Sequence, residues 1–221
     1  MILVGIALAS RKKARTVLAV LNSRTRECQL HHEAELVRGA EGHAADPDAA
    51  MLAFCVRAKV ERVGLDAPLS FPAAVLGRLP VAGTPDYLAR ACDKESGGFA
   101  TLSPGVAPVA ARGMYLRHRL HEAKVAVDEV SPRASLLAFG IPAKLVKGKR
   151  AYTRDLAALR QLHRELHLDG AFRLVRGKVD TPDELNAVIA VLTLLAPPED
   201  TRLVGDPAEG QIRVPARRFW E

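Results

Sequence analysis

Apolar runs of strand length open the chain. Ile2–Ala9 is almost entirely apolar, Thr16–Leu21 is a second apolar run, and Glu27–Leu36 alternates loosely between apolar and polar positions. The polar residues Asn22–Thr25 separate the second run from the third and are typical of a turn. Short runs of this kind are typical of strands that are buried on one or both faces. We therefore predict three consecutive strands joined by short connections.

A helix and a fourth strand are predicted next. Asp46 and Pro47 form a typical helix start, with Asp as the N-cap and Pro in the first helical position. Residues 49–59 continue with helical spacing, and Val63–Asp66 is a short apolar run that a proline soon ends. The predicted order is therefore β-β-β-α-β.

A long segment with little periodicity interrupts the middle of the chain. Residues 77–113 are rich in Gly, Pro, Ser and Ala, and residues 114–123 have the spacing of a helix. Val125–Val130 is again a short, mainly apolar run, and we predict a buried strand there. Long loops in compact domains are more often functional than incidental. We predict a single domain over residues 1–221, with an insertion at about 77–123.

Helical patterns dominate the last third of the chain. The predicted elements are a short helix within 136–146 interrupted by Pro142, a helix over 152–167, a helix from the capping box at 181–184 to Leu195, and a hairpin of 202–204 with 211–214.

Composition adds limits to this outline. The chain has 221 residues, of which 48% are hydrophobic and 26% charged, as in an ordinary globular domain. Its three cysteines are far apart and form no C-x-x-C pair, so neither a disulfide framework nor a zinc ribbon is predicted. We expect a cytoplasmic protein. No apolar stretch has the length that a bilayer requires, so we expect no membrane contact.

Positive charge is concentrated in two segments of the chain. Residues 1–26 and residues 133–154 each hold six basic residues and no acid, whereas the whole chain has a net charge of +7. Such segments either keep loops solvated or neutralise the phosphates of a bound partner, and both interpretations stay open. The six Phe, three Tyr and one Trp do not favour an aromatic platform for single strands.

Two acids end predicted core strands. Asp66 closes the fourth strand and Glu129 lies near the end of the fifth. Burying a carboxylate is costly unless a cation or hydrogen bonds compensate it, and ligands gather at the carboxyl ends of parallel strands. The two acids either form a shared site or accept hydrogen bonds from nearby loop amides.

Several short motifs, taken in order, resemble one known family. They are Val4–Ala9, Gly64–Pro72 with its Asp-Ala-Pro-Leu-Ser-x-Pro run, Arg90–Asp93, Glu129–Pro132, Asp183–Ala187 and Glu209–Pro215. Together they cover nearly the whole chain. The sequence resembles the domain-of-unknown-function 429 family, which is described as predicted RNase H-like nucleases.

The resemblance implies an α/β fold of the RNase H-like type, a mixed five-stranded sheet flanked by helices. In that fold, acids on the first strand, the fourth strand and a late helix hold two divalent cations, Mg²⁺ or Mn²⁺, that hydrolyse a phosphodiester. The implied catalytic residues are Asp66 and Glu129, with Asp183 and Asn186 as further metal ligands. The implied substrate-binding residues are Lys12, Lys13, Arg90, Asp93 and Arg133.

The sequence departs from this pattern at two positions. Ala7 stands where the family has Asp on the first strand, and Asn186 stands where the late helix has Asp. Alanine binds no metal, and asparagine offers one neutral oxygen. Asp183 lies one helical turn before Asn186 and either replaces that ligand or simply favours the positive end of the helix dipole.

Two functions follow as expectations. The first is a hydrolase, a metal-dependent nuclease acting on DNA or RNA whose metal site has lost part of its acids. The second is a catalytically inactive member of the same fold that binds nucleic acid or a protein. A third, less favoured function is a different enzyme or a small-anion binder that uses the same crevice.

Overall fold

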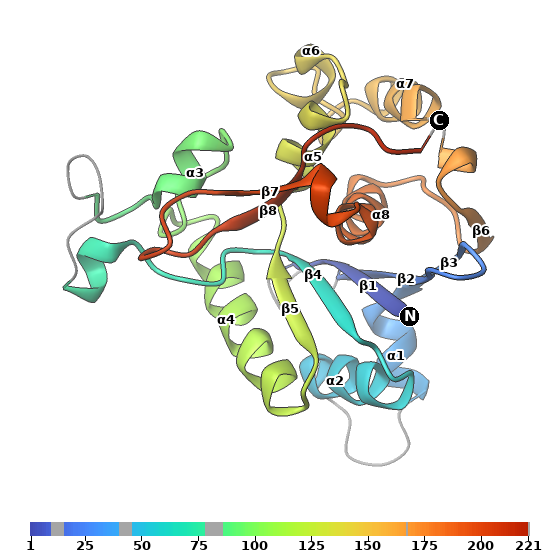
Figure 1. The fold of residues 1–221 in the computed structure, drawn as a ribbon, viewed down its shortest axis with the longest axis horizontal. Helices are drawn as coiled ribbons and strands as arrows, with labels where there is room; N and C mark the ends of the chain where they lie inside the picture. Colours follow the sequence, from blue (N-terminus) through green and yellow to red (C-terminus); the bar gives the residue numbers. More distant parts are fainter. Residues whose placement is uncertain (10–15, 40–45, 78–85, 167, 221) are drawn as a thin grey trace.

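One mixed sheet forms the centre of the protein (Figure 1). The computed structural model describes residues 1–9, 16–39, 46–77, 86–166 and 168–220. The strands of the sheet are β1 (Ile2–Ala7), β2 (Val17–Asn22), β3 (Glu27–His32), β4 (Arg62–Asp66), β5 (Ala126–Glu129) and β6 (Arg173–Arg176).

The strand order is β5-β4-β1-β2-β3-β6. β2 pairs antiparallel with both β1 and β3, whereas β4 is parallel to β1 and β5 is parallel to β4. This order, with these directions, is that of the RNase H-like fold, so the predicted fold class is confirmed. The sixth strand, β6, pairs parallel with β3 and was not predicted.

Helices cover both faces of the sheet (Figure 1). On one face, α2 (Pro47–Arg57) and α4 (Ala107–Glu122) pack on Ile6 and Leu65, and α1 (Glu33–Gly39) lies beside them. On the other face, α8 (Pro182–Leu195) crosses the sheet. Beyond α8 lie α5 (Pro132–Ala138), α6 (Ala143–Val146) and α7 (Leu156–Leu166).

Short elements complete the chain. They are the 3₁₀ turns η2 (Ala73–Leu76), η3 (Leu168–Gly170) and η4 (Pro198–Asp200), the helix α3 (Ala91–Glu95), and the hairpin of β7 (Thr201–Val204) and β8 (Ile212–Pro215). The hairpin was predicted from the sequence, and its antiparallel pairing confirms it.

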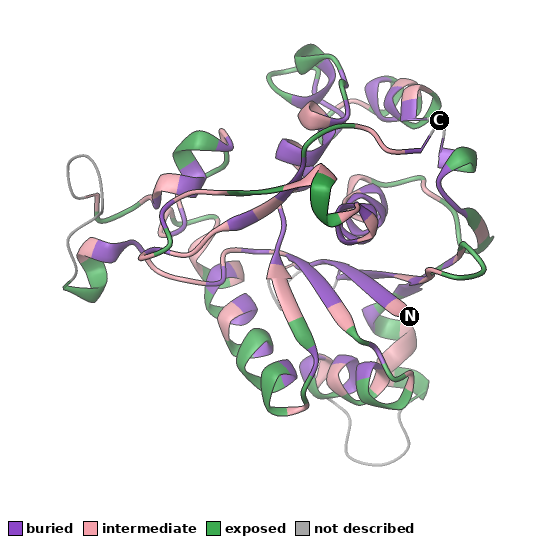
Figure 2. Cartoon of the chain, viewed as in Figure 1, coloured by how far each residue is buried: buried purple, intermediate pink, exposed green. Residues whose placement is uncertain are grey.

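α8 is in direct contact with the sheet because two glycines leave room for it. Gly5 and Gly64 are neighbours in the parallel pairing of β1 with β4. A Cβ atom on Gly5 would overlap the carbonyl oxygen of Ala187, and one on Gly64 would lie 3.0 Å from that of Ala190. α8 is apolar almost all round and is buried along most of its length (Figure 2). This contact fixes the first turns of α8 beside the carboxyl ends of β1 and β4.

Two predicted boundaries were wrong for a physical reason. The third apolar run was expected to stay extended to Leu36, but the strand ends at His32 and α1 begins at Glu33, where a buried Glu33 carboxylate binds Arg112. The helix expected at 114–123 begins at Ala107 and packs on the sheet through Leu116, so it belongs to the core. Among the described helices, none has the length and hydropathy needed to cross a bilayer.

We expect Gly5→Ala to destabilise the protein by roughly 3 kcal/mol, because the added methyl group must push the backbone of α8 away from β1. Gly39→Ala is the matched control, since a Cβ atom at Gly39 meets nothing within 4 Å. Urea unfolding of both variants measures the difference. Equal stability of the two variants would show that the glycine contact does not position α8.

Candidate functional site

A pocket of about 450 Å³ lies at the carboxyl ends of β4 and β5. Its walls come from the segment between β4 and α4, the start of α5, the segment that follows α6, and the first turns of α8. The structure brings six of the predicted site residues to this pocket: Asp66, Arg90, Asp93, Glu129, Arg133 and Asn186.

Asp66 carries a carboxylate whose pKa is raised by its surroundings. Val63 and Leu65 pack on the α2 and α4 face of the sheet, so the Asp66 side chain points to the α8 face. Burial raises the pKa of Asp66 to about 7, and the negative charges of Asp183 and Glu129 raise it further. Within the described residues, no basic side chain pairs with Asp66. The carboxylate is therefore left without a compensating cation.

Two late-helix residues, Asn186 and Asp183, lie near Asp66. Asn186 Oδ1 accepts a hydrogen bond of 2.6 Å from the Tyr152 hydroxyl. Burial raises the pKa of Tyr152, and the charge of Asp66 adds to that effect, so the hydroxyl keeps its proton and donates. Asp183 is close enough for its charge to raise the pKa of both Asp66 and Tyr152.

Ala7 lies beside Asp66 in the sheet. The two residues are neighbours in the pairing of β1 with β4, and Ala7 is buried in the apolar core under α8. Position 7 thus lies where a first-strand acid would join Asp66, but its methyl group offers no ligand atom.

Arg90 forms the centre of a buried polar network on the opposite wall. Its side chain is fully buried, and its guanidinium donates to both carboxylate oxygens of Glu129, with an Nη1–Oε2 distance of 2.7 Å. It also donates to Asp93 Oδ1 at 2.7 Å and to Ser70 Oγ at 2.9 Å. The backbone amide of Leu69 donates to Glu129 Oε2 at 2.8 Å.

The Arg90 network changes the roles that were predicted for three residues. Both oxygens of Glu129 are held by Arg90 and Leu69, so Glu129 is not free to bind a metal ion in this arrangement. Asp93 Oδ2 accepts from the amide and the hydroxyl of Thr101, and Arg90 has no donor left for a substrate. We therefore assign Arg90, Asp93 and Glu129 to positioning the pocket walls.

The ionisation of the network follows from its hydrogen bonds. Burial acts to raise the pKa of Asp93, but the hydrogen bonds and charge of Arg90 outweigh it and hold that pKa below its usual value. Burial raises the pKa of Glu129, and Arg90 opposes that shift. Because both Glu129 oxygens accept from the guanidinium, we describe the pair as ionic.

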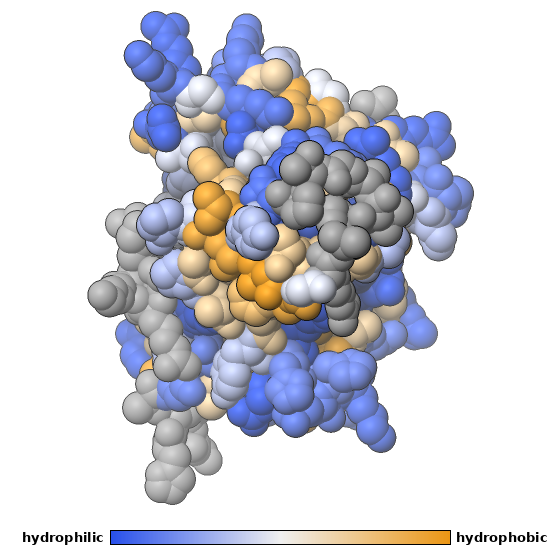
Figure 3. Space-filling model, turned by 90° about the vertical axis from the view of Figure 1, so that its left-hand side faces the viewer, coloured by the Kyte–Doolittle hydropathy of each residue, from blue (hydrophilic) through white to orange (hydrophobic). Residues whose placement is uncertain are grey.

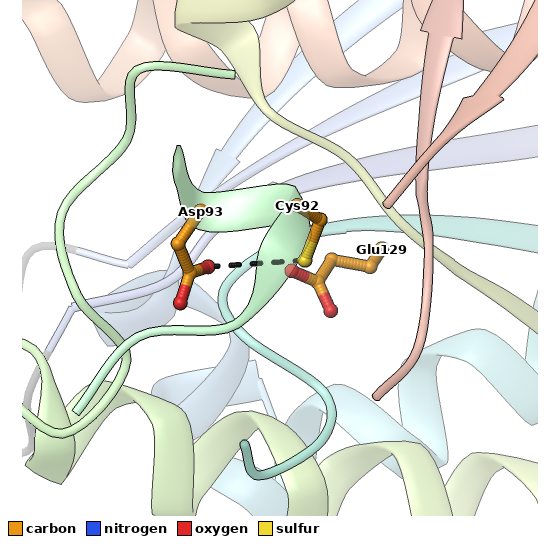
Figure 4. Close-up of side chains that lie close together, drawn as sticks. All are labelled: Cys92, Asp93 and Glu129. Carbon is orange, nitrogen blue, oxygen red and sulfur yellow. Dashed lines mark hydrogen bonds between the residues drawn. The ribbon is translucent and has the colours of Figure 1, made fainter. Parts of the chain in front are cut away.

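Cys92, Asp93 and Glu129 lie close together and resemble a metal site (Figure 4). The Arg90 guanidinium already binds both carboxylates and supplies the positive charge that compensates them. Burial raises the pKa of the Cys92 thiol to about 12, so the sulfur is not a thiolate. These three residues do not fit a metal ion.

Glu209 is a structural residue to which the sequence analysis gave no role. Its buried carboxylate accepts from the Ala73 amide at 2.9 Å and from the Ala91 amide at 2.6 Å. It thereby ties the β7–β8 connection to η2 and to the start of α3. Gly210 follows at φ +93°, and a side chain there would overlap Ser70 Oγ. The Glu-Gly pair within the last motif was the sequence signal for this contact.

Besides the paired Arg90, three basic residues line the pocket: Arg133, Lys147 and Arg154. All three belong to the second basic segment, residues 133–154. Lys12 and Lys13, from the first basic segment, lie outside the described residues. Arg24, also from that segment, lies in the β2–β3 turn at the opposite end of the sheet. The described basic residues of the first segment, Arg24 and Arg26, are therefore remote from the pocket.

Comparison with known proteins gives little beyond the fold. No family model and no curated protein sequence matches this chain. Among solved structures, the Thermus thermophilus RuvC structure aligns with 86% of this chain and 90% of its own, at 13% identity and a TM-score of 0.40. The strand order and directions, not this likeness, identify the fold.

We expect Arg90→Met to destabilise the protein by about 3–5 kcal/mol, because it leaves Glu129 and Asp93 buried without their cation. Arg173→Met is the control, since Arg173 pairs with Glu27 on the surface, where ion pairs contribute little. Thermal and urea unfolding measure both. If Arg90→Met lost no more stability than Arg173→Met, the role of Arg90 as the cation of the buried network would be contradicted.

Asp66→Asn is expected to stabilise the protein at pH 8 and to lose this advantage as the pH falls. The pKa of Asp66 is raised from 3.8 to about 7 in the folded state. The folded protein therefore keeps a proton that the unfolded chain releases, and stability from this group is lost as the pH rises through about 7. The gain at pH 8 should be on the order of 4 kcal/mol, given this shift in pKa.

Urea unfolding in EDTA at pH 5, 6.5 and 8 tests this expectation. Asp169→Asn, which changes an exposed carboxylate, should follow the wild-type profile. A constant difference between Asp66→Asn and the wild type across the three pH values would show that Asp66 does not titrate in this range.

Proposed function

We propose that this protein binds nucleic acid across the pocket and holds a single divalent cation there through Asp66 and Asp183. The observation that carries the proposal is the uncompensated Asp66 carboxylate among the basic residues Arg133, Lys147 and Arg154. A carboxylate next to cationic side chains matches a phosphate whose charge is shared between a metal ion and the protein.

The oxygen ligands near Asp66 fit one hard cation. Magnesium is commonly bound by one or two carboxylates, with water and phosphate completing the shell. Asp66 and Asp183 supply the carboxylates, and Asn186 Oδ1 adds a neutral oxygen that Tyr152 orients. When bound, the cation would supply positive charge to a phosphate oxygen.

The same residues do not fit two cations. Two-metal hydrolysis clamps the attacking and leaving oxygens between paired ions, which requires more carboxylates than one ion does. Position 7 offers no ligand, and the Glu129 carboxylate is held by Arg90. We therefore propose binding as the main function and keep nuclease activity as the alternative.

The central experiment removes the basic side chains that line the pocket. In the combined variant Arg133→Gln, Lys147→Gln and Arg154→Gln, we expect the affinity for a 12-mer DNA or RNA oligomer to fall about 10- to 100-fold at low salt. The slope of log affinity against log salt should fall by about 2–3, because each lost phosphate contact removes about one unit. Fluorescence anisotropy across a salt series measures both quantities.

The matched control removes three exposed basic residues from the opposite end of the molecule: Arg24, Arg57 and Arg119, each changed to Gln. It has the same net charge as the pocket variant and should keep wild-type affinity. Equal losses in both variants would mean that binding follows net charge alone. Absence of wild-type binding at low salt would overturn the proposed function.

A second arm separates a binder from a degraded nuclease. Calorimetric titration with Mg²⁺ and Mn²⁺ should show one site that Asp66→Asn removes. If Ala7→Asp gains a second metal site and oligomer cleavage, the pocket has the geometry of a nuclease that lacks one acid. Cleavage by the wild-type protein that Asp66→Asn abolishes would favour the nuclease alternative.

A further inference from the structure

Phe99 is an aromatic side chain exposed at the wall of the pocket. It is 71% exposed, the highest value among the large hydrophobic residues that the structure describes as exposed, and it lines the pocket that also contains Asp66. On the side of the molecule where η2 and α3 lie, hydrophobic surface gathers in a central band between hydrophilic regions (Figure 3). An exposed phenyl ring at a pocket has apolar area available for a ligand.

The loop that carries Phe99 is held on both sides. The Gly98 amide donates to the Asp93 carbonyl at 2.8 Å, and the Thr101 amide and hydroxyl both donate to the Asp93 carboxylate. Asp93 is in turn fixed by Arg90. The ring is therefore presented by a loop whose backbone is already ordered, which lowers the entropy cost of binding.

Arg133 lies beside the ring. Its guanidinium carbon is 5.9 Å from the centroid of the Phe99 ring. Its Nε is buried and has no hydrogen-bond partner within the described part of the chain. A guanidinium group and an exposed aromatic ring that line the same pocket match the two halves of a nucleotide, a charged phosphate and a planar base.

We propose that Phe99 stacks an unpaired base while Arg133 binds the adjacent phosphate, so that the substrate class is single-stranded nucleic acid. This inference rests on the proposed function and specifies its ligand. In a duplex the base faces are covered by neighbouring bases and cannot reach the ring. The pocket volume of about 450 Å³ lies in the range of small-ligand sites and suits one nucleotide.

The test compares three fluorescein-labelled probes by anisotropy at fixed low salt: a single-stranded 12-mer, its duplex, and the same strand with abasic sites. We expect the wild type to bind the single strand at least about tenfold more tightly than the duplex. The Phe99→Ala variant should bind the single strand with about tenfold lower affinity than the wild type. Its affinity for the duplex and for the abasic strand should equal that of the wild type. Phe99→Trp should retain wild-type affinity.

Tyr87→Leu is the control, because Tyr87 is also an exposed aromatic of the same segment but does not line the pocket. Because Phe99 is exposed, its variants should unfold at the wild-type temperature. Equal wild-type affinity for the single strand and the duplex, or equal losses of Phe99→Ala on the base-bearing and abasic strands, would overturn this inference alone. Absence of binding to every probe would overturn the proposed function with it.

Discussion

The buried pairing of Arg90 with Glu129 and Asp93 is the interaction on which the pocket depends. It joins the end of β5 to α3, and through Ser70 it reaches the loop that follows β4. A guanidinium removed from water is tolerated only when its hydrogen bonds are filled. The described parts of the segment between β4 and α4, residues 67–77 and 86–106, therefore have a defined position at the carboxyl end of the sheet, although they contain little regular structure.

The two walls of the pocket differ in how far their buried charges are compensated. On the wall at β5, one cation serves two carboxylates, and the hydrogen bonds of all three groups are made inside the protein. On the wall at β4, Asp66 has acidic neighbours and no basic partner among the described residues. The first wall is complete without a ligand, whereas the second gains stability when a cation or a proton arrives.

Local pattern was enough to predict the fold but not the contacts of the site. The apolar runs of β1 and β4 and the capping box of α8 determined those elements, and Asp66 was predicted to be a site residue because it closes a core strand. β6 was missed because this edge strand is mostly exposed and carries two arginines. The role of Glu129 depends on Arg90, 39 residues away, and such a contact leaves no periodic signal in the sequence. The aromatic count likewise gave no indication that a single ring, Phe99, would lie at the pocket.

The glycine contact between α8 and the sheet also restrains the acidic edge of the pocket. With backbone against backbone at Gly5 and Gly64, there is no layer of side chains in which α8 could slide or tilt. The positions of Asn186 and Asp66 at the edge of the pocket are therefore fixed. The segment 147–150 is exposed, and Tyr152 anchors the chain just beyond it through Asn186. A ligand in the pocket would thus meet a rigid acidic edge on one side and this exposed segment on the other.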